Sequence, residues 1–191
     1  MIQKGTIRKM GQYYRNDPKY KEEILCGVIE FYGEKNINDI DQPLFNEWMM
    51  YDFKFSDSKG MLKKFYEENP MGIPLYRREI YRSLMENYYG LFEVLDVKKF
   101  QSLLLRRVSD KKIFNVSEIS ATLDLEIGDI FVTRVAKVID HYELVGCDTQ
   151  VIKLSETKNK KERDIFIKRV SSLIKIDTPK DAMAFLRIIS N

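Results

Sequence analysis

Apolar side chains recur every three or four positions through much of the first part of the chain. In residues 20–32 they share one helical face, which predicts an amphipathic helix. Asp17-Pro18 comes just before this segment and suits a helix start, because aspartate caps the first turn and proline fits its first position. Gly33 can adopt the left-handed conformation with which many helices end. We therefore expect a helix that begins near Pro18 and ends at Gly33.

The same spacing predicts three further helices, over residues 43–53, 61–66 and 75–89. The last of them is expected to end at Gly90. In the helix over 43–53 the aromatic residues share the inward face, and Glu47 belongs to the polar face. The first ninety residues are therefore expected to be helical.

The pattern changes after Gly90 to short runs rich in branched and aromatic residues. In residues 112–119 apolar and polar side chains alternate, which is typical of a half-buried strand. Gly128-Asp129 is a turn signal between two such runs. Five short strands fit into residues 91–147, at the spacing of an antiparallel meander or a small barrel.

The last part of the chain is charged, with apolar residues at helical intervals over residues 156–176. Thr178-Pro179 is expected to start a final helix, because threonine caps and proline fits the first turn. The fold class expected is α+β. Its three parts are a helical subdomain over 1–90, a small β-barrel-like module over 91–150 and a C-terminal helical segment over 151–191.

The composition fits a globular chain. Of 191 residues, 44% are hydrophobic and 32% charged, which suits one compact domain or two small ones. The net charge of +3 is too small to predict a nucleic-acid partner by itself. Residues 1–20 and 153–180 carry an excess of basic residues, and residues 30–60 an excess of acidic ones. This asymmetry can steer an anionic partner, although solvated helix surfaces and a mobile first segment account for it more simply.

Several classes of protein are not expected. No apolar run approaches the roughly 18 residues that a membrane span needs, and residues 1–20 contain no secretory signal, so we expect a cytoplasmic protein. Cys26 and Cys147 lie far apart in the sequence, and each is expected to be a reduced, apolar core residue. With one histidine and two cysteines, we expect no disulfide framework, no metal site and no cofactor.

Three segments together resemble a known group of proteins. They read LFNEWMMYDFKF, MENYYGLFEVLDV and FNVSEISATLDLEIGDIFVTRVAKVIDHYELVGC. Over roughly residues 44–147 the chain resembles a family of uncharacterised bacterial proteins, some members of which carry a SEC-C zinc motif. The resemblance implies a helical part followed by a small β module, with no assigned activity. The zinc motif needs a cysteine cluster that this chain lacks, so zinc binding is not implied.

Motifs of catalysis are missing from the sequence. It contains no phosphate-binding loop, dinucleotide fingerprint, nucleophile elbow or HExxH helix. His141 falls between two predicted strands, where a general base can be exposed, but turns also take aspartate and histidine for conformational reasons. Pairs of carboxylates such as Asp124 and Glu126 have no third group nearby in sequence. We therefore expect a protein that is not an enzyme, with no catalytic residue.

Basic side chains near the C-terminus offer a way to bind nucleic acid, because phosphate contacts need only flexible positive charge. The candidates are Lys158, Lys160, Lys161, Arg163, Lys168 and Arg169. Arg134, with Arg106 and Arg107, can add a cationic track on the predicted strands. The aromatic residues between 51 and 92 can form stacking platforms, but most recur at helical intervals that indicate core packing.

Three functional hypotheses follow. The first is a non-enzymatic binding or regulatory module that engages a macromolecular partner, such as an unknown protein. The second is a nucleic-acid-binding protein that holds RNA or single-stranded DNA with the basic C-terminal helix and the β module. The third is an enzyme that uses His141 with a nearby carboxylate. No membrane partner is expected.

Overall fold

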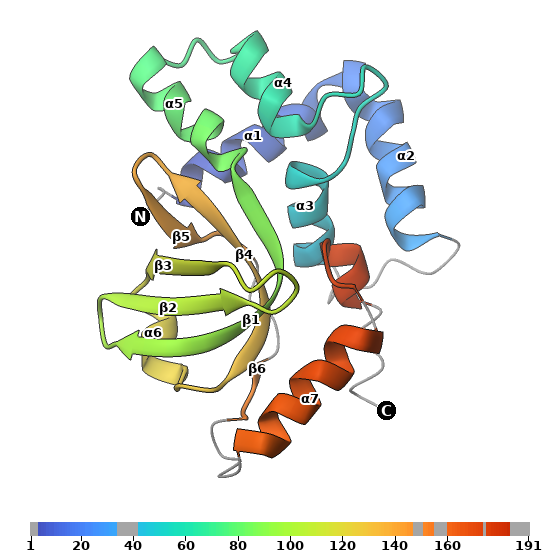
Figure 1. Ribbon diagram of the computed structural model, residues 1–191. Helices are drawn as coiled ribbons and strands as arrows, with labels where there is room; N and C mark the ends of the chain where they lie inside the picture. Colours follow the sequence, from blue (N-terminus) through green and yellow to red (C-terminus); the bar gives the residue numbers. More distant parts are fainter. Residues whose placement is uncertain (1–3, 34–41, 147–150, 155–159, 174, 184–191) are drawn as a thin grey trace. The chain divides into compact units, whose positions relative to one another are not determined.

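The chain folds into two compact units, Met1–Glu86 and Asn87–Asn191, in the computed structural model (Figure 1). We call them the helical unit and the sheet unit. The structure describes residues 4–33, 42–146, 151–154, 160–173 and 175–183. The boundary lies before the predicted one at 90/91, because the first strand begins at Asn87. The predicted C-terminal segment over 151–191 clusters with the sheet.

The helical unit contains the helices that the apolar spacing predicts, together with one more. In chain order they are α1 (Lys4–Asn16), the 3-10 turn η1 (Pro18–Tyr20), α2 (Lys21–Tyr32), α3 (Gln42–Tyr51), α4 (Met61–Glu68) and α5 (Leu75–Leu84). The predicted start near Pro18 is confirmed, since the Asp17 carboxylate accepts a hydrogen bond from the backbone N–H of Lys19 at 3.0 Å. The predicted end is also confirmed, with Gly33 at φ 65°.

Helix α1 was not predicted, because a basic first segment is compatible with a mobile start of the chain. Its side chains Met10 and Tyr14 are both 0% exposed. The Tyr14 ring meets the Tyr20 ring edge to face, with 4.8 Å between their centres. Met10 and Tyr14, one helical turn apart, therefore hold α1 in place. Charged residues surround them in the sequence, so the apolar spacing is hard to recognise there.

Three expectations about this unit are wrong. The helix predicted over 75–89 ends at Leu84, because backbone pairing with a later strand draws the following residues into β1. Glu47 is buried at 4% exposed, although it was assigned to a polar face. Cys26 is exposed, although it was expected in the core, since α2 buries Phe31 and Tyr32 instead. Cys147 and the loop predicted over 36–43 lie wholly or largely outside the described residues.

The sheet unit contains the five predicted strands and a short sixth. They are β1 (Asn87–Lys98), β2 (Ser102–Arg107), β3 (Ile113–Ser117), β4 (Ile130–Val138), β5 (His141–Leu144) and β6 (Val151–Ile152), with the short helix α6 (Ala121–Asp124) between β3 and β4. The sheet order is β1-β2-β3-β5-β4-β6, with β1 also paired to β4. The expected antiparallel five-stranded meander is wrong, because β3 and β5 pair in parallel in a mixed sheet.

Strand β1 is long enough to serve two neighbours. Its first part, from Asn87 to Glu93, pairs with β4, and its second part, from Phe92 to Lys98, pairs with β2. The register shifts between Val94 and Asp96, where an irregularity bends the strand. As a result, each of the strands β1 to β5 has a hydrogen-bonded neighbour on both sides.

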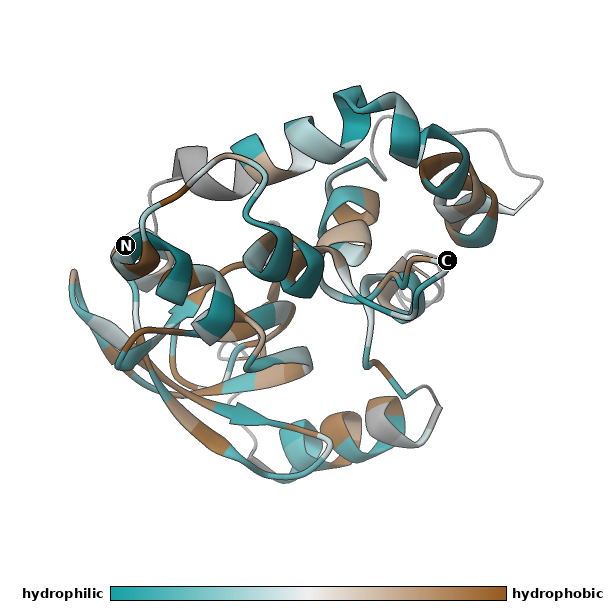
Figure 2. Cartoon of the chain, turned by 90° about the horizontal axis from the view of Figure 1, so that it is seen from above, coloured by the Kyte–Doolittle hydropathy of each residue, from teal (hydrophilic) through white to brown (hydrophobic). Residues whose placement is uncertain are grey.

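Alternation along the strands separates two hydrophobic clusters, and hydrophobic and hydrophilic segments alternate along the strands in Figure 2. The first cluster consists of Phe92, Val94, Leu103, Leu105, Phe114, Val116, Leu125, Phe131 and Val135. The second is built on the opposite faces of β1 and β4 and consists of Tyr89, Leu91, Val108, Ile130, Val132, Leu154, Ile167, Val170, Ile176 and Ala182. Helix α7 (Lys160–Leu173) therefore packs on the outer face of β1 and β4.

The predicted start of the final helix is confirmed. Residues 179–183 are helical. The Thr178 backbone N–H donates to the Asp181 carboxylate at 2.9 Å, and the Asp181 N–H donates back to the Thr178 hydroxyl at 3.3 Å. This reciprocal cap fixes the start of the helix.

Candidate functional site

The outward side chains of β2 and β3 form a surface that we call the β2–β3 face. It consists of Ser102, Leu104 and Arg106 from β2, opposite Ser117, Asn115 and Ile113 from β3. The three β3 side chains are exposed, and the three β2 side chains are half-buried. The alternate residues of both strands point into the first hydrophobic cluster, so strand periodicity alone turns this mostly uncharged strip outward.

Two pairs of exposed lysines stand at the ends of this face. Lys98 is the last residue of β1 and Lys99 follows it in the turn to β2, whereas Lys111 and Lys112 lie in the turn between β2 and β3. The turns lie at opposite ends of the five-residue strand β3, about 17 Å apart at 3.4 Å per residue. We call these residues the lysine pairs.

The charges of the lysine pairs are not neutralised locally. The Lys99 ammonium donates to the carbonyl of Leu123 at 3.2 Å, and that of Lys111 to the carbonyl of Val108 at 2.8 Å. The Lys112 ammonium donates to the Tyr88 hydroxyl at 2.5 Å. Within the described part of the chain, none of the four lysines forms an ion pair with a carboxylate. Their positive charge is therefore available to an anionic ligand.

The arginines beside the face do have carboxylate partners. Arg106 binds the Glu93 carboxylate on β1, with 2.5 Å from Nη2 to Oε2. Arg107 binds Asp110 in the turn after β2, and this hydrogen bond lowers the pKa of Asp110 to about 2. Both pairs hold the shape of the hairpin, which leaves the excess positive charge of residues 87–117, six basic against three acidic side chains, on the lysine pairs.

Arg134 lies on β4 and is only 1% exposed, although it was predicted as a nucleic-acid contact. Its Nη1 donates to the side-chain carbonyl of Asn87 at 2.5 Å, and its guanidinium carbon stands 4.8 Å from the centre of the Tyr89 ring. A phosphate cannot reach this group while the strand is in place. Arg134 therefore acts inside the sheet unit.

The other predicted basic residues that the structure describes lie along α7. Arg163 is half-buried, and a Cβ added at Gly128 would lie 3.2 Å from its Nη1, so its guanidinium lies against that backbone. Lys161, Lys168 and Arg169 are exposed, and the acidic Glu162 and Asp164 are exposed on the same helix. Lys158 lies outside the described residues, and Lys160 is described only as the first residue of the helix. Their role in nucleic-acid binding stays a prediction.

His141 lies at the start of β5 between two carboxylates. Its Nδ1 is 2.9 Å from Asp140 Oδ1, and its Nε2 is 2.9 Å from Glu143 Oε1. The hydrogen bond with Asp140, followed by that with Glu143, raises the pKa of the imidazole above its ordinary value. Because both ring nitrogens already face carboxylates, the geometry favours a positively charged structural imidazolium over a general base.

We expect the imidazole of His141 to titrate above pH 6.5, the ordinary value for histidine. A raised folded pKa means that its contribution to stability is full below about pH 6.5 and is lost as the pH rises through the folded pKa. NMR measures this directly, because the chain has one histidine and so one imidazole signal. Glu143→Gln should lower the midpoint, and a wild-type midpoint at or below 6.5 would contradict the geometry.

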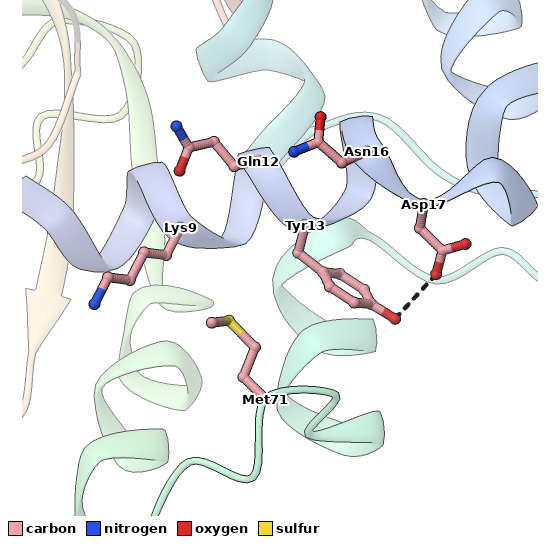
Figure 3. A pocket seen from close by; sticks show the side chains of 6 residues that line it. All are labelled: Lys9, Gln12, Tyr13, Asn16, Asp17 and Met71. Carbon is pink, nitrogen blue, oxygen red and sulfur yellow. Dashed lines mark hydrogen bonds between the residues drawn. The ribbon is translucent and has the colours of Figure 1, made fainter.

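A pocket of about 490 Å³ lies in the helical unit (Figure 3). It is lined by Lys9, Gln12, Tyr13, Asn16, Asp17 and Met71. Its central polar groups bind each other, since the Tyr13 hydroxyl donates to the Asp17 carboxylate at 3.2 Å. Burial and this carboxylate raise the pKa of Tyr13. The phenol therefore stays protonated and is no candidate for a base.

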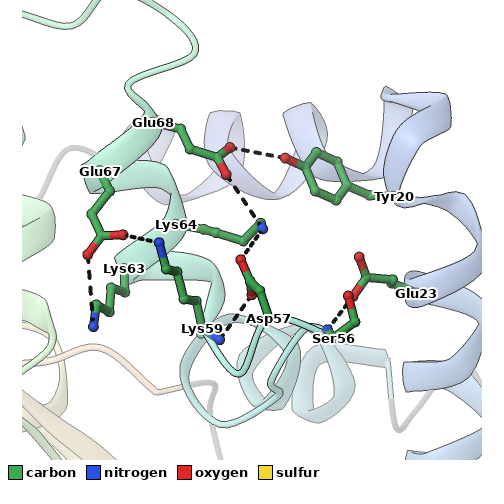
Figure 4. A network of polar contacts seen from close by, with 9 residues as sticks. All are labelled: Tyr20, Glu23, Ser56, Asp57, Lys59, Lys63, Lys64, Glu67 and Glu68. Atoms are coloured by element: carbon green, nitrogen blue, oxygen red, sulfur yellow. Dashed lines mark hydrogen bonds and ion pairs between the residues drawn. The ribbon is translucent and has the colours of Figure 1, made fainter.

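A polar network in the same unit surrounds Lys64 (Figure 4). The ammonium of Lys64 is 2.6 Å from the Asp57 carboxylate and 3.5 Å from that of Glu68. The Tyr20 hydroxyl donates to the Glu68 carboxylate at 3.0 Å, and the Lys64 ammonium lies 5.6 Å from the centre of the Tyr20 ring. Burial by itself lowers the pKa of Lys64. The hydrogen bond with Asp57 and the nearby carboxylates have the opposite and larger effect, so the pKa is raised overall. The lysine remains charged and stabilises the unit, unlike a nucleophilic lysine.

The described residues contain no group of three or more histidine, cysteine, aspartate or glutamate side chains arranged to hold a metal ion. They also contain no helix that is both long and apolar enough to span a bilayer.

Comparison with known proteins yields no relative. No family model matches the chain, no curated protein is significantly similar to it, and no solved structure is significantly similar to its fold.

The lysine pairs were missed by sequence reasoning, which followed the density of charge along the chain. They form two short Lys-Lys sequences, one on each side of β2. That placement was a usable signal, because residues that directly precede a strand and residues that directly follow it lie at opposite ends of that strand. Charge counting favoured the longer basic stretch on α7 instead.

Proposed function

We propose that the sheet unit is a small, partly closed five-stranded barrel that binds nucleic acid on its β2–β3 face. The strand order supports this, since it runs β1-β2-β3-β5-β4 and returns to β1, with a short helix between β3 and β4. Barrels of the oligonucleotide- and oligosaccharide-binding type are five-stranded, and they use the face of strands 2 and 3 for ligands. A shared fold does not by itself define a function, so the proposal depends on the chemistry of this face.

The observation that carries the proposal is the position of the lysine pairs. They place four positive charges without carboxylate partners at the two ends of a mostly uncharged strip. Phosphates along one strand need such flexible cations at intervals, and serine and asparagine on the strip can donate hydrogen bonds to sugar and base. A neutral oligosaccharide would gain little from the lysines, which is why we favour the nucleic acid.

A second candidate is the binding of a protein partner, in a non-enzymatic and regulatory role. It is supported by the large apolar side chains exposed in the sheet unit, among them Ile119 and Leu123, which are 46% and 51% exposed. Exposed apolar groups are typical of protein interfaces when they form a continuous patch. The resemblance to uncharacterised bacterial proteins and the cytoplasmic location stay predictions beside both candidates.

Binding is tested with fluorescent single-stranded RNA and DNA of about 12 nucleotides, by anisotropy between about 50 and 200 mM salt. We expect an affinity that falls with salt, and a double variant Lys111→Gln/Lys112→Gln that binds about tenfold more weakly at low salt and has a slope smaller by about 1.4, or 0.7 for each lost phosphate contact. The matched control is Lys161→Gln/Lys168→Gln on α7, which removes the same charge.

The outcomes separate the alternatives. The proposal requires that the β2–β3 turn variant loses affinity and the α7 variant does not. The reverse result would assign binding to the predicted residues of α7, and no binding of either oligonucleotide at low salt would leave the protein partner as the better candidate.

A further inference from the structure

Phe100, in the turn between β1 and β2, is unfavourable for the stability of the fold in two ways. Phe100 is 64% exposed, so its ring lies largely in water. Its backbone has φ 61°, the left-handed region that is unfavourable for a residue with a Cβ. Neither the exposed ring nor the left-handed backbone stabilises the sheet unit. Such strain recurs at functional sites. Ile139, in the turn between β4 and β5, is also exposed and left-handed, so the aromatic ring and the neighbouring lysines are what single out Phe100.

The turn holds this phenylalanine in a defined position. The Phe100 backbone N–H donates to the hydroxyl of the fully buried Thr122 at 2.9 Å. The N–H of Gln101 donates to the carbonyl of Lys98 at 3.0 Å, and its carbonyl accepts from the N–H of Glu118 at 3.2 Å. The backbone of the turn is therefore tied to the segment around α6, so the point at which the Phe100 side chain leaves the backbone is fixed before any ligand arrives.

We propose that Phe100 stacks on a base, and that the ligand of the β2–β3 face is therefore a single-stranded nucleic acid. This inference rests on the proposed function. An exposed ring at the tip of a hairpin can receive a base only if the base is free of its own stack and pair, as in a single strand. The bases of an intact duplex are already stacked on each other, so a duplex offers the ring no partner.

The charges beside the ring favour a nucleic acid over an apolar protein segment. Lys98 and Lys99 directly precede Phe100, are exposed and have no carboxylate partner among the described residues. A base on the ring would bring its own phosphates within reach of these ammonium groups. An apolar protein segment would leave the same charges near a surface without counter-ions, which is unfavourable.

The test compares three labelled oligomers of equal length with the full chain, by anisotropy at low salt. They are a single strand of pyrimidine nucleotides, an abasic strand with the same phosphates, and a duplex. We expect the single strand to bind most tightly. Phe100→Ala should weaken its binding about 5- to 150-fold, the range for one stacked base, and should leave the abasic strand unchanged. Phe100→Trp should retain or strengthen binding.

Two further variants separate stacking from effects on folding. Phe100→Gly relieves the left-handed strain, so its midpoint of thermal unfolding should be no lower than that of the wild type, while its affinity falls as in Phe100→Ala. The control Ile165→Ala removes another exposed apolar side chain, 56% exposed on α7, and should change neither quantity.

The results distinguish failure of the stacking role from failure of the nucleic-acid function. If Lys111→Gln/Lys112→Gln weakens binding but Phe100→Ala does not, the nucleic-acid function stands and the stacking role is overturned. Equal affinity for duplex and single strand, or an equal loss on the abasic strand, also overturns it. If no oligomer binds, both proposals fail, and a protein partner becomes the better account of the exposed ring.

Discussion

Replacing Phe92 with alanine should lower the unfolding free energy of the sheet unit by about 3–5 kcal/mol. Phe92 is 0% exposed and is one of two positions, with Glu93, at which β1 pairs with both of its neighbours; its partners are Arg107 on β2 and Phe131 on β4. Its ring also meets the Phe114 ring edge to face, with 5.9 Å between centres. The substitution removes this contact and leaves a cavity where two strand pairings meet.

Denaturant unfolding followed by far-UV circular dichroism measures this loss. A conservative variant, Phe92→Leu, keeps most of the apolar volume and should cost markedly less. Ile165→Ala, at an exposed position of α7, should be nearly neutral. A loss below about 1 kcal/mol for Phe92→Ala would mean that β1 does not join the two sides of the sheet as the structure has it.

Replacing Arg134 with methionine should lower the unfolding free energy by about 3 kcal/mol and leave the oligonucleotide affinity of the folded protein unchanged. The guanidinium is 1% exposed, donates to Asn87 and lies over the Tyr89 ring. Methionine fills part of the volume but cannot donate, so the amide oxygen of the half-buried Asn87 loses this hydrogen bond.

The matched control is Arg106→Met, which also breaks an arginine contact. Arg106 is 37% exposed at its side chain and pairs with Glu93, so its loss should cost at most about 1 kcal/mol. Reduced oligonucleotide binding by a fully folded Arg134→Met variant would restore the role that the sequence predicted for Arg134. Equal costs for the two variants would mean that Arg134 is solvated.

Local patterns were sufficient for most of the elements. The Asp17-Pro18 start, the Gly33 end and the Thr178 cap were predictable because each depends on groups within a few residues of the chain. The exposure of Asn115 and the burial of Phe114 followed from alternation, because successive side chains of a strand point to opposite faces.

Tertiary contacts decided the cases in which two patterns were compatible with the same residues. The segment after Leu84 fits a helical period, yet β4 offers a strand partner, and backbone pairing turns residues 87–89 into β1. The parallel pairing of β3 with β5 joins segments that are distant in the chain, so no local turn sequence predicts it. Helix α1 was also missed, because the burial of Met10 and Tyr14 depends on residues from elsewhere in the chain that pack on them.

The candidate site shows the same division. The sequence by itself determined how many positive charges there are and that strands occupy this region. Only the tertiary structure decided which charges are free: it buries Arg134, pairs Arg106 and Arg107 with carboxylates, and leaves the lysine pairs at the ends of one exposed face. Charge and periodicity are properties of the chain, whereas burial and pairing depend on neighbours that folding brings from elsewhere.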